Sequence, residues 1–238
     1  RLFADDCVIY RQIDDPSDTN YLQSDINKIN DWCMQWQMKI NTSKTKAITF
    51  TTASSPLPCH YTLNNVPIES VPTIKYLGVH LASDLSWNRH IDAIINKASK
   101  TLGFLRRNLR LANENTKLLA YNSLVRSKVE YASLIWNPNQ TCLVAKLESL
   151  QNKAARFISQ NYWRTSSVTE IKKDLHLPLL ERRRMFSLLS FFHKIYHSHS
   201  SFAMCHITPA HHIFPRFDHE MKVEPIFART NLFFHSPL

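Results

Sequence analysis

The chain has 238 residues, of which 44% are hydrophobic, and its formal net charge is +10. This size and composition suit one large globular domain or two modest ones, and no apolar run approaches the roughly 18 residues of a membrane span. Because it holds only two glycines, Gly78 and Gly103, the sequence excludes the glycine-rich phosphate loops of the Walker and dinucleotide-binding types.

The first half of the chain alternates short apolar runs with turn residues. Two short strands are predicted around a tight turn at Ala4–Asp6, and an amphipathic helix is predicted over 18–38. Further strands are predicted at 46–51, 60–63, 66–68 and 74–81, with Asn64–Asn65 as a hairpin turn and Gly78 as either a bulge or a point of close approach in the last strand. We expect the Asp5–Asp6 turn to pack against the 18–38 helix and the strand at 46–51, because their apolar faces have no other partners.

From Trp87 onward the apolar residues recur with a helical period. Helices are predicted at 87–109, 118–129, 143–158 and 180–196, with a short helix that Ser167 opens and Pro178 ends. Trp136 and Trp163 are predicted to be core or inter-helix anchors. An irregular tail is expected beyond Ser198. The sequence therefore predicts an α+β fold, with a small unit of strands and one helix followed by a helical unit.

The charge and the cysteines indicate partners and compartment. An excess of basic residues favours a polyanionic partner, most simply nucleic acid. The five cysteines are scattered and form no CxxC pair, which favours a reducing, intracellular location, nuclear or cytoplasmic, and not secretion. The chain begins with Arg1 and shows no signal-peptide pattern, so we expect a fragment of a longer protein.

Asp5 and Asp6 are the first candidates for a functional site. Adjacent carboxylates repel each other, so the pair gains nothing unless a divalent cation lies beside it. Taken alone, Phe3–Asp6 (FADD) is a weak signal, because a solvated turn capped by aspartate has the same sequence.

Several stretches taken in order resemble the C-terminal half of a reverse transcriptase from a non-LTR (LINE-like) retrotransposon. FADD matches the [YF]-A-D-D signature of the palm domain, and DWCMQWQMKINTSKTKAITF, residues 31–50, resembles the next palm motif. KYLGVHL, residues 75–81, resembles the element that grips the primer strand. The later helical stretches resemble the thumb and post-thumb segments: RHIDAIINKASKTLGFLRR, VEYASLIWNP, LESLQNKAARFI and LHLPLLERRRMFSL.

The resemblance implies a fold and an activity. Residues 1–84 would be the remainder of the palm, with antiparallel hairpins and a helix, residues 85–165 a helical thumb-like bundle, and residues 166–238 a post-thumb region. The intact enzyme is an RNA-directed DNA polymerase, whose partners are an RNA template, a DNA primer and deoxynucleoside triphosphates. Asp5 and Asp6 would be catalytic ligands of two Mg²⁺ ions. Lys44 would protonate the departing pyrophosphate, a role for which Lys46 competes.

The same resemblance implies nucleic-acid contacts. Leu77 and Gly78 would lie at the primer grip, where glycine lets a backbone approach closely. Five cations on the predicted helix from Trp87 would contact phosphates: Lys97, Lys100, Arg106, Arg107 and Arg110. The alternative is that they are only the solvated face of an amphipathic helix.

Two alternatives stay open. Reverse transcriptases of this type need a third carboxylate and nucleotide-holding fingers from motifs that precede FADD, so the chain alone is expected to be inactive. It is part of a polymerase or a non-catalytic nucleic-acid-binding remnant of one, and a third possibility is the product of a decayed element with no selected role. The histidines after His176 suggest a zinc site to which His193, His197, His199, Cys205, His206, His211 and His212 could contribute, but without a cysteine pair incidental surface histidines are the better interpretation.

Overall fold

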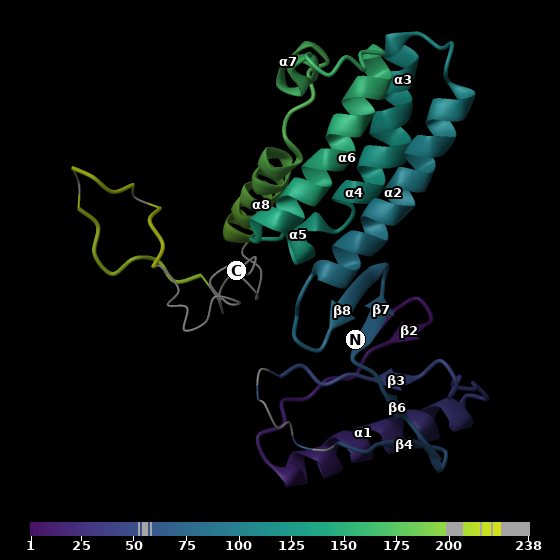
Figure 1. Ribbon diagram of the computed structural model, residues 1–238. Helices are drawn as coiled ribbons and strands as arrows, with labels where there is room; N and C mark the ends of the chain where they lie inside the picture. Colours follow the sequence, from purple (N-terminus) through teal and green to yellow (C-terminus); the bar gives the residue numbers. More distant parts are fainter. Residues whose placement is uncertain are drawn as a thin grey trace. The chain divides into compact units, whose positions relative to one another are not determined.

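The computed structural model describes residues 1–51, 53, 57, 59–198, 207–214, 216–219 and 221–224. Two compact units are present, Arg1–Ser86 and Trp87–Leu238, and each is taken here by itself. Within the described residues, the first unit combines a helix with pairs of short strands and the second is helical (Figure 1). This mixture of helix and strand is compatible with the predicted α+β class.

Helix α1 (Pro16–Gln35) is the longest element of the first unit, and its start is encoded locally. The Asp15 side chain accepts a hydrogen bond from the Ser17 amide at 2.7 Å, and the Asp18 carboxylate accepts from the Asp15 amide at 3.1 Å. This reciprocal cap, followed by Pro16 at the first helical position, begins the helix two residues before the predicted start. Arg11 also donates to Asp25 at 2.9 Å and lowers the pKa of that carboxyl.

The strands of the first unit form four separate two-stranded pairs. Three pairs are antiparallel, and two of them, β1–β2 and β4–β5, are the predicted hairpins; β3 pairs with β6 in parallel. The bounds are β1 Leu2–Phe3, β2 Asp6–Cys7, β3 Lys46–Ala47, β4 Thr62–Leu63, β5 Val66–Pro67, β6 Glu69–Ser70, β7 Thr73–Tyr76 and β8 Val79–Ala82. The predicted strand at 46–51 is therefore reduced to its first two residues.

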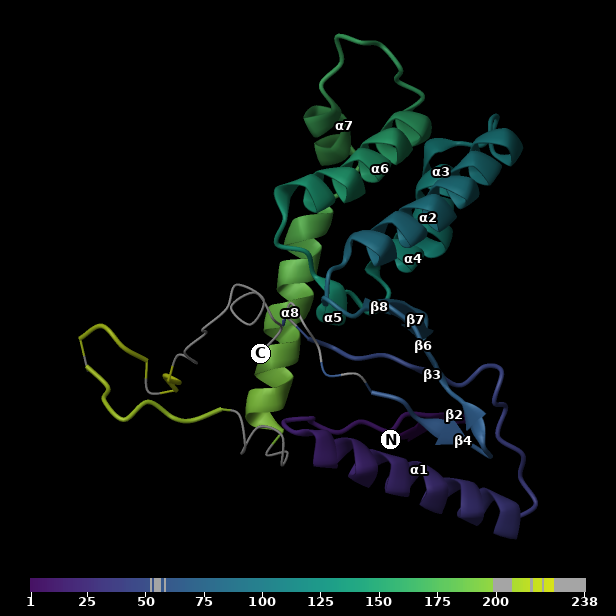
Figure 2. The same cartoon turned by 60° about the horizontal axis from the view of Figure 1, so that its bottom comes forward.

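Gln23 of α1 joins the helix to β4, which runs beside it (Figure 2). Its side-chain amide donates to the Thr62 carbonyl and accepts from the Thr62 amide, both at 2.9 Å. One amide side chain thus satisfies both backbone groups of a strand residue, as a neighbouring strand would.

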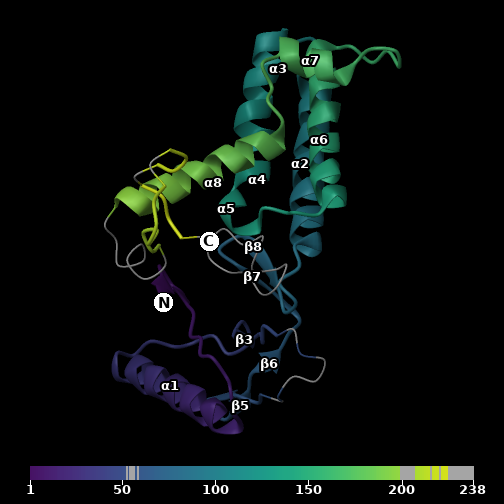
Figure 3. The ribbon, with the colours of Figure 1, turned by 90° about the vertical axis from the view of Figure 1, so that its left-hand side faces the viewer.

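The second unit is built around α2 (Asn88–Asn108) and α6 (Thr141–Ser159), which lie side by side (Figures 1 and 3). The predicted helix at 118–129 is a continuous helical run whose middle turns have π geometry. Its segments and the remaining helices are α3 Glu114–Ala120, the π-helix Tyr121–Arg126, α4 Ser127–Glu130, α5 Ser133–Trp136, α7 Val168–Asp174 and α8 Leu180–His197.

The core of the second unit consists mainly of fully buried apolar side chains. Ile91, Leu147 and Trp136 are fully buried, and they come from α2, α6 and α5. Trp136 confirms the prediction of an inter-helix anchor, whereas Trp163 does not, because its side chain is 77% exposed. No helix in the described part of the chain is long and apolar enough to cross a membrane.

Candidate functional site

The FADD motif forms the tip of an exposed β-hairpin. Phe3 pairs with Asp6 across the two strands, so only Ala4 and Asp5 form the turn. Ala4 takes a φ of +50°, in the left-handed region that two-residue hairpin turns require. Asp5 therefore lies at the tip as predicted, but Asp6 is the first residue of β2 and not part of the turn.

The hairpin does not pack as predicted. Leu2 and Phe3 are 77% and 61% exposed, and both aspartates are exposed as well. The expectation that this turn packs against α1 and the strand at 46–51 was wrong, because residues 1–7 are all exposed and the main strand contact of α1 is with β4.

The two aspartates fit part of a divalent-metal site. Their carboxylates are exposed and supply the hard oxygen ligands that Mg²⁺ prefers. Among the described residues, however, no group of three or more His, Cys, Asp or Glu side chains could hold a metal ion. Asp5 and Asp6 could thus contribute two ligands to a site that needs further ligands.

Lys44 lies in an exposed turn whose geometry Asn41 sets. The Asn41 side-chain oxygen accepts from the Ser43 hydroxyl at 2.7 Å and from the Lys44 amide at 3.2 Å. Its competitor Lys46 is held in an ion pair with Glu69 at 2.5 Å, across the parallel β3–β6 pair. Because its ammonium is engaged, Lys46 is the weaker candidate for an acid, and the assignment to Lys44 stays a prediction.

Leu77 and Gly78 form a turn and not a bulge. Tyr76 pairs directly with Val79, so the predicted single strand at 74–81 is a hairpin of β7 and β8. Leu77 and Gly78 both take a positive φ, +45° and +86°, as the favoured two-residue hairpin turn demands. The prediction of a bulge was wrong because the pairing register leaves these two residues as the loop, with Gly78 exposed.

The five predicted phosphate-binding cations are all exposed on or just beyond α2. Lys100 and Arg107 lie on one face, since they are seven residues apart. Lys97 is ten residues before Arg107, about 80° around the helix from it, and so lies at the edge of that face. The Arg106 guanidinium lies 5.8 Å from the centre of the Tyr162 ring, which follows α6 in the chain. The five cations are therefore spread around the exposed side of α2 and do not lie in one row.

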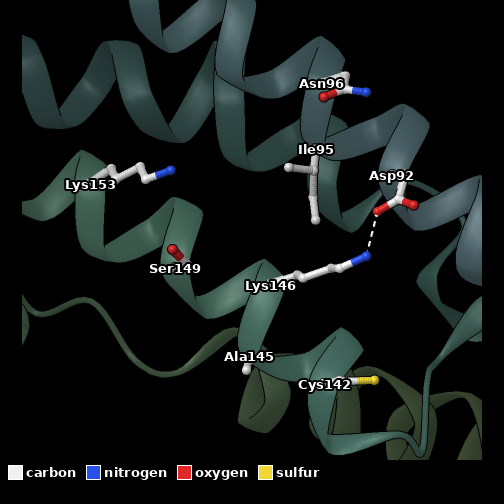
Figure 4. Close-up of a pocket in the computed structure, with 8 residues that line it drawn as sticks. All are labelled: Asp92, Ile95, Asn96, Cys142, Ala145, Lys146, Ser149 and Lys153. Atoms are coloured by element: carbon white, nitrogen blue, oxygen red, sulfur yellow. Dashed lines mark hydrogen bonds and ion pairs between the residues drawn. The ribbon is translucent and has the colours of Figure 1, made fainter.

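The sequence analysis missed the cations of α6. Lys146 and Lys153 line an open pocket of about 800 Å³ between α2 and α6, together with Asp92, Ile95, Asn96, Cys142, Ala145 and Ser149 (Figure 4). The signal was present in the sequence, because Cys142, Lys146, Ser149 and Lys153 follow each other at spacings of four, three and four residues.

The predicted histidine cluster is only partly within the described residues. His193 and His197 lie on one face of α8, as their spacing predicted, with their ring centres 4.3 Å apart and the rings tilted by 48° to each other. His199, Cys205 and His206 lie outside the described residues. No metal-binding group is found in the part of the chain that the structure covers.

Comparison with curated proteins gives four significant relatives, all of them polymerases of mobile elements. The chain is 29% identical over 180 residues to a probable RNA-directed DNA polymerase from transposon X-element of Drosophila melanogaster, a match that covers 74% of this chain and 20% of the relative. It is 28% identical over 164 residues to the RNA-directed DNA polymerase from mobile element jockey of Drosophila funebris, covering 67% of this chain and 18% of the relative.

A third relative is a probable RNA-directed DNA polymerase from transposon BS of Drosophila melanogaster, 26% identical over 166 residues, with 68% of this chain and 18% of the relative covered. The chain thus spans about a fifth of the length of the relatives it matches. No family model and no solved structure matches it. The predicted resemblance is nevertheless confirmed, because over 67–74% of its length the chain is a sequence relative of the RNA-directed DNA polymerases of non-LTR retrotransposons.

Proposed function

We propose that this chain is part of an RNA-directed DNA polymerase of a non-LTR retrotransposon. Residues 1–84 are the palm remainder, residues 85–165 the thumb and residues 166–238 the post-thumb region. The observation that supports this most is Asp5 exposed at a hairpin tip, with Asp6 next to it, within a chain similar to four such polymerases. The proposed partners are an RNA template, a DNA primer and deoxynucleoside triphosphates, inside the cell.

The proposed chemistry is nucleotidyl transfer. Divalent ions in such a site activate the attacking hydroxyl and neutralise the leaving pyrophosphate. Asp5 and Asp6 would hold these ions, because their short side chains present carboxylates at the end of a hairpin. Lys44 would supply a proton or a positive charge to the leaving group, and its exposed position leaves it accessible to a polyphosphate.

The first unit exposes several large apolar side chains, as expected for a polymerase segment that packs against other parts of the protein. Leu2 and Phe3 of the hairpin and Trp32, Met34 and Trp36 at the end of α1 are all more than half exposed. Exposed apolar groups of this size are characteristic of surfaces that pack against another element. We infer that other segments of the palm cover them.

Primer extension tests the proposal directly. Residues 1–238 alone are expected to give no extension, because the resemblance implies a third carboxylate and nucleotide-holding fingers from preceding motifs. A longer polypeptide that also carries these motifs should extend a primer on an RNA template with Mg²⁺. There, Asp5→Asn should abolish extension, since the amide keeps the shape but loses the charge that holds the ion.

The control is Asp14→Asn, which removes the same charge from another exposed aspartate of the first unit and should leave extension unchanged. Full activity of Asp5→Asn would show that the hairpin is only a solvated turn. If the longer polypeptide binds nucleic acid but never extends a primer, the alternative of a non-catalytic binding remnant is correct.

A further inference from the structure

Two rows of mostly polar residues run along α2 and α6, each on one face of its helix. On α2, Asp92, Asn96, Lys100, Gly103 and Arg107 follow each other at spacings of four or three residues, which places them on one face. On α6, the row is Cys142, Lys146, Ser149, Lys153 and Arg156. Each row has the spacing of a single helical stripe and is separate from the buried stripe of its helix, apart from Gly103 and Arg156, which are half-buried.

Two contacts join the helices, one near each end of these rows. At one end, the Lys146 ammonium binds the Asp92 carboxylate at 2.8 Å (Figure 4). At the other end, the Gln160 side chain donates to the Arg110 carbonyl at 3.0 Å. The first contact joins the N-terminal parts of α2 and α6, and the second joins the residues that follow their C-terminal ends. The two helices are therefore parallel.

The groove between these contacts is open and basic. The pocket described above occupies the half nearer Asp92, and its polar lining includes Asn96, Ser149 and Lys153. In the other half, Gly103 has no side chain, and the Arg107 guanidinium lies over it, with Nη1 3.7 Å from where a Cβ would be. The pocket lining thus holds two cations, Lys146 and Lys153, and one carboxylate, Asp92. Arg107 lies beyond it over Gly103, and Lys100 is exposed on the same face of α2 as Arg107.

We propose that this groove between α2 and α6 binds the sugar–phosphate backbone of one strand of a nucleic-acid duplex. The inference rests on the proposed function and assigns its duplex contacts to two helices, of which α6 was not among the predicted binding elements. Lys146 and Lys153 are seven residues apart, as are Lys100 and Arg107, so each wall places its cations about 10 Å apart. That spacing corresponds to about three phosphate steps of one strand along a duplex axis.

The Asp92–Lys146 pair gives the proposal a distinctive consequence. In the free protein Asp92 is paired with Lys146, and an incoming phosphate must compete with it for that cation. Removal of this carboxylate should therefore strengthen binding. If the groove did not bind phosphate, removal of the Asp92 carboxylate would not strengthen duplex binding more than removal of another exposed carboxylate.

Binding of a labelled RNA–DNA hybrid duplex by the 238-residue chain, titrated over a range of salt concentrations, tests the groove. Lys153→Gln should weaken binding severalfold and reduce the slope of log affinity against log salt by about one. Asp92→Asn should strengthen binding and steepen that slope by about one, because it frees Lys146 for a phosphate. Two variants with the same charge changes on exposed residues elsewhere in the second unit, Lys194→Gln on α8 and Asp174→Asn on α7, should leave the slope unchanged.

A positional measurement uses the native thiol at the groove's end. Cys142 is exposed and lies four residues before Lys146 in the α6 row. A hybrid duplex that carries a disulfide tether on its backbone should cross-link to Cys142 at low salt, and Cys142→Ser should remove that product. Cys7, which is exposed in the first unit, serves as the internal reference for accessibility.

The outcomes separate the groove from the proposed function. If Lys97→Gln, at the edge of the Lys100–Arg107 face of α2, weakens binding while Lys153→Gln and Asp92→Asn behave as their matched controls, the groove assignment is overturned and binding by α2 stands. If the unaltered chain fails to bind the duplex even at low salt, the proposed nucleic-acid interaction itself is overturned, and the groove assignment with it.

Discussion

At the scale of single residues, the two glycines of this chain have opposite roles. Gly78 takes a φ of +86° in the β7–β8 turn, where a side chain is disfavoured. Gly103 lies inside α2, where an added Cβ would meet only the flexible end of Arg107 at ordinary contact distance. The conformation of the backbone, and not the residue type, decides what each glycine does for stability.

Exchange of each glycine for alanine should therefore change stability in opposite directions. Gly78→Ala should lower the free energy of unfolding of the first unit by about 1–2 kcal/mol, because it forces a Cβ into the left-handed region. Gly103→Ala should stabilise the second unit by about 0.5–1 kcal/mol, because alanine loses less entropy in a helix. Urea unfolding followed by circular dichroism measures the change in the second unit, and hydrogen exchange of the β7 and β8 backbone amides measures the change in the first, whose core is small. A gain in stability from Gly78→Ala would contradict the turn geometry.

At the scale of elements, the short helix α5 shows how a segment of four residues can organise a bundle. Trp136 at its end is fully buried, its indole N–H donates to the Tyr131 carbonyl at 2.8 Å, and its ring lies 5.2 Å from that of His90 on α2. Next to it, Arg184 of α8 is almost fully buried and donates to Asn137 at 3.0 Å, and burial lowers the pKa of this guanidinium. The segment 133–137 therefore connects α2 and α8.

Two tryptophan variants test this connection. Trp136→Ala should lower the free energy of unfolding of the second unit by about 3–5 kcal/mol, through lost burial and the cavity left behind. Trp163→Ala removes the same side chain from the surface and should change stability by no more than about 0.5 kcal/mol. The urea midpoints of the two variants provide the comparison, and equal midpoints would show that α5 is not an anchor.

At the scale of the whole molecule, the apolar core is unevenly divided. Among the described residues, the buried apolar side chains of the first unit are Tyr61, Leu63, Val79 and Ala82, whereas every other one belongs to the second unit. Since burial of apolar surface is the main favourable contribution to folding, the two units differ strongly in the stability that they can have alone.

Polypeptides of residues 1–86 and 87–238 should therefore behave differently. The second should unfold cooperatively in urea and should bind the RNA–DNA hybrid if the α2–α6 groove is the binding surface. The first should show no cooperative transition, because four buried apolar side chains cannot offset the entropy of ordering 86 residues. A sharp transition for residues 1–86 would contradict this division of the core.

Local patterns in the sequence predicted much of the fold. The apolar period predicted α2, α6 and α8, and Asn64–Asn65 predicted the β4–β5 turn, where both residues take a positive φ. These features depend on interactions within a few residues, which a single sequence displays directly. The motif order also predicted the relationship to RNA-directed DNA polymerases.

Features that join distant residues could be settled only by the tertiary structure. The register of β7 and β8 converted the predicted bulge at Gly78 into a turn, and the packing of α2 against α6 brought Lys146 and Lys153 beside the cations of α2. Trp136 and Trp163 look alike in sequence, yet one is buried and the other exposed. The sequence by itself determined the helices, their apolar faces and the family likeness, because these follow from local spacing. Strand register, burial and the shared groove depend on which elements meet, and only the folded chain decides that.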